Sequence, residues 1–287
     1  MRSAYRSTTG ASHTRRWCRA ALERWPLPHV VESIDTSLGQ TQVVSAGSGP
    51  ATCLYLPGTN FNAATSGALV AALALRCRIH VADLPGQPGL SDERRPVQEV
   101  SGYAAWVREL VTWVRTQRPG VPVVLAGHSR GAAVALSADP VDVDGLALLS
   151  PAGLTQVRPS FAMLGATVPW LVRRNPAGAR RLLDFMSGPG RVPSAELVDW
   201  MTVVARWCRT TGAPDPLPDV DLARWRGHPM VVAVGDSDAF FPAPRLAVAC
   251  RTLLGVEALV VPRTGHLLVE EEPDLVARLV SGLVDDS

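Results

Sequence analysis

The chain has 287 residues, of which 47% are hydrophobic and 19% charged, so it is long enough to bury one large core. Its formal net charge of +2, with basic residues scattered along the chain, argues against a nucleic-acid-binding protein. Five cysteines without a C-x-x-C pair argue against a disulfide framework or a zinc site. They predict buried thiols in a reducing compartment, which for this chain means the cytoplasm.

The N-terminal residues 1–16 are rich in Arg, Ser and Thr and show no hydrophobic periodicity, which predicts a disordered tail without a targeting signal. Trp17, Ala21 and Trp25 then recur every four residues, so a short helix should follow, ended by two nearby prolines. Residues 1–28 are therefore expected to form a tail and a short helix.

From Val30 to Ala46 the pattern is typical of β-strands, and its interruption at Leu38-Gly39 predicts an antiparallel hairpin. Strands and helices then alternate, which indicates parallel strands joined by helical crossovers. The predicted strands are 51–56, 78–84, 121–126, 145–149, 230–234 and 257–261, and the predicted helices are 63–75, 100–116, 132–136, 246–254 and 272–284.

The alternation stops after residue 150 and resumes after residue 221. The segment between, 151–221, is rich in Trp, Met, Pro and paired Arg, with helical spacing of its apolar residues. We predict a helical cap of residues 151–221, inserted into an α/β core of residues 29–150 and 222–287. The longest apolar run of this segment, 161–172, is shorter than the roughly 20 residues of a membrane-spanning helix, so no membrane span is predicted.

The string Gly127-His128-Ser129-Arg130-Gly131 lies between a predicted strand and a predicted helix. A turn that tight forces the serine into a strained backbone conformation and leaves no space for side chains two positions away, hence the two glycines. Ser129 is therefore a candidate nucleophile. A serine hydroxyl needs a base within hydrogen-bonding distance, and the base needs a third group to orient it.

Of six histidines, only His266 lies on a loop that directly follows a strand, where α/β sheets place reacting groups, so it is the predicted base. His128 adjoins the serine but is expected to point away across the turn. Two aspartates follow the strand 230–234: Asp238 is the preferred acid and Asp236 the second choice. Either aspartate could instead cap the next helix.

Along the chain, Ser129, Asp238 and His266 follow the order serine, acid, histidine, which is typical of one α/β architecture. Over residues 30–285 the chain resembles the α/β-hydrolase superfamily, and residues 25–28 with 36–41 resemble the N-terminal region of some bacterial carboxylesterases. This resemblance implies an α/β-hydrolase fold, a mostly parallel central sheet flanked by helices, with an inserted helical cap. It also implies a serine carboxylesterase that needs no metal or other cofactor.

Two further loops support the resemblance. Leu56-Pro57-Gly58-Thr59-Asn60 stands where many relatives carry His-Gly, and 83–91 is similar to the family's D-x-P-G-x-G-x-S loop, which we interpret as structural. By position, the resemblance implies that the backbone N–H groups of Thr59 and Arg130 form the oxyanion hole. The Arg130 side chain could also bind an acidic substrate, although a solvated or paired guanidinium is the commoner arrangement.

Asn60 and Asn62 stand where a polar substrate group could be met, although loop asparagines more often bond their own backbone. Cap side chains could line an apolar pocket or simply pack the helices. We predict that Asn60, Phe161 and Trp170 contact the substrate. The other cap residues considered are Met163, Phe185, Trp200, Met201 and Trp207.

The sequence thus predicts a serine hydrolase that cleaves a small-molecule carboxylic ester through an acyl-enzyme intermediate. Because one fold supports many reactions, thioester cleavage, acyl transfer and a lyase reaction on a specialised metabolite stay open. A non-catalytic small-molecule receptor on the same fold is the third alternative. Dehalogenase chemistry is disfavoured because it needs a carboxylate where Ser129 stands. Oligomeric state is left open.

Overall fold

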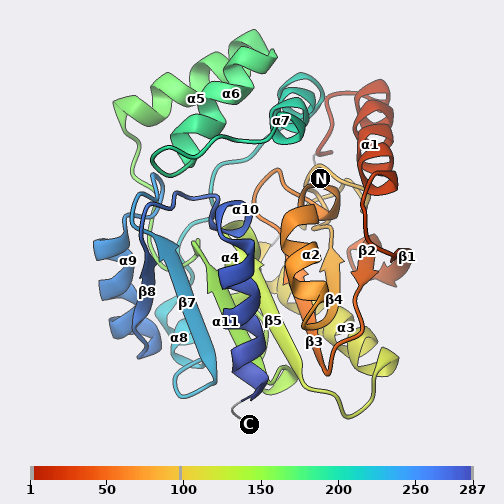
Figure 1. The fold of residues 1–287 in the computed structure, drawn as a ribbon, viewed down its shortest axis with the longest axis vertical. Coiled ribbons are helices and arrows are strands. Elements are labelled where there is room, and N and C mark those ends of the chain that lie inside the picture. The colour runs from red at the N-terminus through yellow and green to blue at the C-terminus, as the bar shows by residue number, and fades with distance from the viewer. Residues whose placement is uncertain (1–2, 97–98, 286–287) are drawn as a thin grey trace.

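A computed structural model describes residues 3–96 and 99–285 of the chain. Its centre is an eight-stranded sheet in the order β1-β2-β4-β3-β5-β6-β7-β8 (Figure 1). The strands are β1 (His29–Thr36), β2 (Gly39–Ala46), β3 (Ala51–Leu56), β4 (Cys77–Ala82), β5 (Val123–His128), β6 (Gly145–Leu149), β7 (Met230–Gly235) and β8 (Ala258–Val261).

Strand direction divides this sheet into two parts. β1 and β2 form the predicted antiparallel hairpin, with Thr36 paired to Gly39 across the turn, and β2 pairs antiparallel with β4. All other neighbouring strands run parallel. The predicted mostly parallel sheet is therefore confirmed, and its parallel strands end at one common edge.

Helices cover both faces of the sheet, with α2 and α11 on one face and α3, α4 and α9 on the other (Figure 1). Each face of the sheet carries a hydrophobic core, because side chains alternate between the two faces along a strand. In β5, Val124 and Ala126 belong to one core, and Val123 and Leu125 belong to the other. The core helices are α2 (Gly67–Ala74), α3 (Glu99–Gln117), α4 (Arg130–Leu136), α8 (Asp219–Ala223), α9 (Ala243–Ala249), α10 (Leu268–Glu271) and α11 (Pro273–Asp285), with short helices η1 (Ala63–Thr65), η2 (Pro140–Asp142) and η3 (Cys250–Leu254).

Three helices between β6 and the C-terminal strands lie over the edge of the sheet where the parallel strands end (Figure 1). These cap helices are α5 (Phe161–Arg173), α6 (Pro176–Met186) and α7 (Ala195–Trp207). Side-chain oxygens of Ser160, Asn175 and Ser194 accept backbone N–H bonds at the three N-termini, which is why the helices begin there.

The N-terminal segment differs from the prediction. Helix α1 spans Thr8–Glu23 and begins nine residues before Trp17, with Ser7 as its N-cap, and Ala4 and Tyr5 before it are buried. The predicted disorder was therefore wrong for the described residues 3–16. The helix packs on α7: the His13 ring stacks on Trp207, Trp17 Nε1 donates to Asp199 Oδ2 at 2.6 Å, and the Trp17 ring packs on Trp200. The segment thereby ties the cap to the core.

All five cysteines are buried free thiols, as predicted. In the parts of the chain that the structure describes, no helix combines the length and the apolar character needed to cross a bilayer.

Asp83, the first residue after β4, has a structural role in the loop that it begins. Its buried carboxylate accepts the N–H groups of Ala63 and Leu90, each at 2.7 Å, and so joins the loop after β4 to the segment that follows β3. We expect Asp83→Ala to lower the free energy of unfolding by about 3 kcal/mol, because two buried N–H groups lose their acceptor. Urea titration measures this change. The exposed Asp35→Ala variant is the control, and an equal effect in both would contradict the role.

Candidate active site

Ser129 lies on the sharp turn between β5 and α4. Its φ is 51° and its ψ −114°, a strained conformation held by the packing around it. A Cβ on Gly131 would lie 1.9 Å from the Leu56 carbonyl oxygen, and one on Gly127 would lie 2.4 Å from that of Gly131. Only glycine fits at both positions, so the physical reason predicted for the G-x-S-x-G string holds in the structure.

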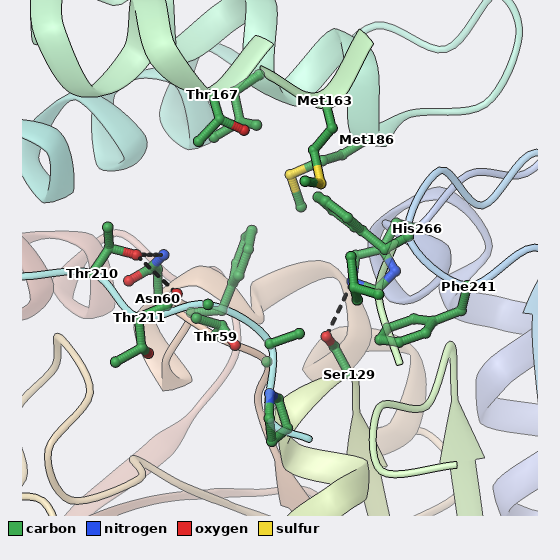
Figure 2. A pocket seen from close by; sticks show the side chains of 18 of the residues that line it. Thr59, Asn60, Ser129, Met163, Thr167, Met186, Thr210, Thr211, Phe241 and His266 are labelled. Atoms are coloured by element: carbon green, nitrogen blue, oxygen red, sulfur yellow. Dashed lines mark hydrogen bonds between the residues drawn. The ribbon is translucent and has the colours of Figure 1, made fainter. Parts of the chain in front are cut away.

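His266 reaches Ser129 from the loop between β8 and α10. Its Nε2 lies 3.1 Å from Ser129 Oγ (Figure 2). Its Nδ1 lies 2.9 Å from Asp238 Oδ2. All three side chains are almost fully buried. When the ring proton lies on Nδ1, it forms a hydrogen bond to the Asp238 carboxylate. The unprotonated Nε2 can then accept the proton of the Ser129 hydroxyl. The structure therefore brings together the three residues that the sequence singled out.

Asp238 follows β7 and is anchored by the backbone ahead of it. Its Oδ1 accepts the N–H groups of Phe240 and Phe241, both at 2.9 Å, while Oδ2 faces the imidazole. Burial raises the pKa of Asp238, but the neighbouring His266 and these hydrogen bonds outweigh it and hold the pKa below its ordinary value. Asp236 is exposed and accepts the Arg263 N–H instead, so it does not take part in the contact.

His128 lies at the site, and the prediction that it points away was wrong. Its Nε2 lies 2.8 Å from the His266 carbonyl oxygen, and the two rings are 5.1 Å apart. A carbonyl only accepts, so Nε2 carries the proton. Burial lowers the pKa of His128 to about 3, which keeps the ring neutral. Tertiary packing of the His266 loop on β5 sets this contact, which no sequence pattern signals.

Glu271, on α10, holds the loop of His266 in position. Its Oε2 accepts the N–H of Gly265 at 2.8 Å and its Oε1 that of Gly188 at 2.9 Å. The N–H of His266 donates to the Met186 carbonyl at the end of α6. The histidine loop is thus held to the cap at His266 directly and at Gly265 through Glu271. Sequence reasoning missed Glu271 because it stands in a run of three glutamates.

We expect Glu271→Gln to lower kcat about tenfold with little change in KM, since the amide nitrogen opposes one N–H donor and loosens the position of His266. Steady-state kinetics on the best ester found measures this. Glu272→Gln is the matched control, because that neighbour pairs with Arg191 away from the loop. Equal kcat values for both variants would show that Glu271 does not position the histidine.

The turn after β3 passes directly beside Ser129. A Cβ on Gly58 would lie 3.3 Å from Ser129 Cβ, and the Thr59 side chain projects beside the serine (Figure 2). Arg130 begins α4, so its N–H is one of those that a helix leaves unused in its first turn. The Arg130 guanidinium donates to Thr59 Oγ1 at 3.2 Å and to the Gly212 carbonyl at 2.7 Å. It therefore braces the turn against the chain leaving the cap.

A cavity of about 470 Å³ opens above Ser129, between the cap and the ends of the strands. Figure 2 shows Met163, Thr167 and Met186 projecting into it from the cap helices. Of the predicted contacts, Asn60 and Trp170 line the cavity, whereas the prediction for Phe161 was wrong, because that side chain is 95% exposed on the outer side of α5. From the cap helices Leu171, Leu182 and Met201 also line it, and Gln156, Val157 and residues 210–215 line it from the flanking segments, whereas Phe185, Trp200 and Trp207 do not.

Polar groups gather at one side of this cavity. Asn60, in a left-handed conformation with φ 66°, donates through Nδ2 to Thr210 Oγ1 at 2.8 Å, and Thr210 and Thr211 line the wall (Figure 2). The Asn60 Oδ1 atom is buried with no partner among the described residues. Asn62 instead accepts the N–H of Thr65 in its own turn, the commoner arrangement for loop asparagines, and donates through Nδ2 to the Pro88 carbonyl of the loop after β4.

Comparisons with known proteins agree with the fold. A family model described as "Alpha/beta hydrolase family" matches residues 53–279. A search of the curated proteins found no significant match.

Solved structures share the fold at low identity. A carboxylesterase from Bacillus subtilis has a TM-score of 0.80 at 18% identity, covering 98% of this chain and 100% of its own. The naproxen esterase of Bacillus subtilis gives 0.78 at 20%, covering 95% and 97%. A meta-cleavage product hydrolase from Pseudomonas fluorescens gives 0.70 at 18%, covering 89% and 97%. At this identity the likeness shows a common fold.

Proposed function

Since the chain belongs to the alpha/beta hydrolase family, we propose that it is a serine hydrolase that cleaves small-molecule carboxylic esters through an acyl-enzyme intermediate. The observation that carries this proposal is the continuous contact from Ser129 Oγ through the His266 ring to the buried Asp238 carboxylate. A hydroxyl, an imidazole and a carboxylate in that order constitute a nucleophile, its base and the group that orients the base.

In the first half-reaction, Ser129 Oγ attacks the ester carbonyl carbon while His266 Nε2 takes the hydroxyl proton. Asp238 stabilises the imidazolium that forms. The tetrahedral intermediate then collapses: the bond to the alcohol oxygen breaks, and His266 returns the proton to that oxygen. The acyl group stays on Ser129. In the second half-reaction, water repeats the attack with His266 as base, and the carboxylic acid leaves.

The backbone N–H groups of Thr59 and Arg130 are the proposed donors to the oxyanion. The Thr59 N–H donates to no acceptor within the described residues, and its turn packs against the serine. Loss of one such donor typically costs about 3 kcal/mol of transition-state stabilisation. The contacts of the Arg130 guanidinium with Thr59 and the cap support a bracing role for this side chain, in place of the direct contact to an acidic substrate considered from sequence.

The cavity favours an ester with one apolar group of moderate size. Methionine, leucine and aromatic side chains dominate its cap side, while Asn60, Thr210 and Thr211 offer hydrogen bonds on the other. We propose that the apolar acyl or aryl group lies under α5 and α6 and that a polar group of the substrate lies on the side of Asn60, Thr210 and Thr211.

A substrate panel tests the proposal: p-nitrophenyl esters of increasing chain length, alongside lactones and thioesters, combined with fluorophosphonate labelling and peptide mass spectrometry. We expect ester turnover and a label on Ser129. Turnover of thioesters alone would move the assignment to a thioesterase. Labelling without hydrolysis of any substrate would favour acyl transfer or a lyase, and no labelling would favour the non-catalytic receptor.

A further inference from the structure

Helix α5 carries an apolar stripe on its outer side, opposite the cavity. Phe161 is 95% exposed, Val172 72%, and Leu164 and Val168 about half. These positions follow the spacing i, i+3, i+7 and i+11, which places all four side chains on one narrow face of a helix. No charged residue interrupts the helix from Phe161 to Val172. A helix that is apolar on every side is normally buried, and here one side is open to solvent.

Arginines surround this stripe. Residues 151–194 contain six arginines and one acidic residue, a net charge of +5 in a chain whose total is +2. The one acidic residue, Asp184, is paired with Arg180. Arg158 and Arg173 lie exposed before and at the end of the helix, and Arg181 of α6 reaches the outer face of α5 beside Gly165. Arg158, Arg173 and Arg181 therefore place positive charge beside the exposed apolar stripe of α5.

We propose that the outer face of α5 docks the protein on an anionic lipid surface. Phe161, Leu164, Val168 and Val172 would enter the boundary between headgroups and acyl chains, while the flanking arginines bind lipid phosphates. With 13 residues, α5 is too short to span a bilayer, so this binding is peripheral. Charge complementarity favours a lipid surface over a second copy of the chain, whose same face would bring two arginine-rich surfaces together.

Helix α5 lies between the exposed apolar stripe and the catalytic cavity. The inner side of the same helix lines the catalytic cavity through Met163, Thr167 and Leu171, so docking would bring the cap and its cavity next to the lipid (Figures 1 and 2). Esters dissolved in the lipid would then have a short path to Ser129. This consequence rests on the proposed ester hydrolysis, whereas docking itself does not.

Vesicle flotation tests the docking, with all proteins in the Ser129→Ala background so that failure of the proposed hydrolysis cannot affect the result. We expect binding to vesicles of equal parts phosphatidylglycerol and phosphatidylcholine, weak binding to pure phosphatidylcholine, and release in high salt. Phe161→Asp and Val168→Asp should each weaken binding about tenfold or more. Arg158→Ala with Arg181→Ala should weaken it about twentyfold on anionic vesicles only.

Leu75→Asp is the matched control, because Leu75 is 86% exposed on the core, away from the cap. It should bind like the parent. Circular dichroism confirms that each variant is folded. Equal binding of parent and Phe161→Asp, or no preference for anionic vesicles, would overturn the proposal. A dimer in analytical ultracentrifugation that dissociates on Val168→Asp would assign the face to a second copy of this chain and overturn it as well.

Discussion

Replacing Ser129 with alanine should lower kcat for ester hydrolysis by about a millionfold, the size of effect seen when a serine nucleophile is removed from a comparable constellation. The loss is so large because no other hydroxyl stands within reach of His266 Nε2 among the described residues. Fluorophosphonate labelling should disappear with it. Burst kinetics with a p-nitrophenyl ester measures both the turnover and the missing acyl-enzyme.

The same variant should keep its fold, since the strain at residue 129 belongs to the backbone and alanine occupies less space than serine. The midpoint of urea unfolding checks this. Ser137→Ala, on the turn that ends α4, is the matched control and should keep full activity. Hydrolysis retained by purified Ser129→Ala protein would rule out covalent catalysis through this residue.

Replacing Asp238 with asparagine should lower kcat about ten-thousandfold. The asparagine oxygen can still accept from Phe240 and Phe241, so the turn keeps its shape. Its amide nitrogen, however, then faces His266 Nδ1 and favours the tautomer with the proton on Nε2. That tautomer cannot accept the proton of Ser129, so the nucleophile loses its base.

The neighbouring aspartate supplies the control for this experiment. Asp236→Asn removes a carboxylate two residues away that is exposed and bonded to Arg263, so kcat should stay within about twofold of the wild-type value. Steady-state kinetics on one ester compares both variants. Loss of activity in Asp236→Asn with activity kept in Asp238→Asn would reverse the assignment of the acid.

Much of the core could be predicted because its signals are local. The strands Ala51–Leu56 and Gly145–Leu149 have the bounds that their apolar runs indicated, since a strand buried on both faces needs a continuous apolar sequence between polar turns. The turn at Ser129 could also be predicted from the sequence. Gly127 is required by backbone contacts within the turn itself, whereas Gly131 is required by the Leu56 carbonyl of the neighbouring strand β3, which only the fold brings there.

What the sequence by itself determined is thus the series of strands and helices, the nucleophile turn and the candidate base and acid. Only the tertiary structure decided the rest. It made residues 8–16 helical by packing α1 on α7, turned Phe161 outward, and placed His128 and Glu271 against the loop of His266. The reason is physical: the period of a segment tells which of its faces is apolar, but the partner of each face is set by elements far away in the chain, and so are the hydrogen bonds of isolated polar side chains.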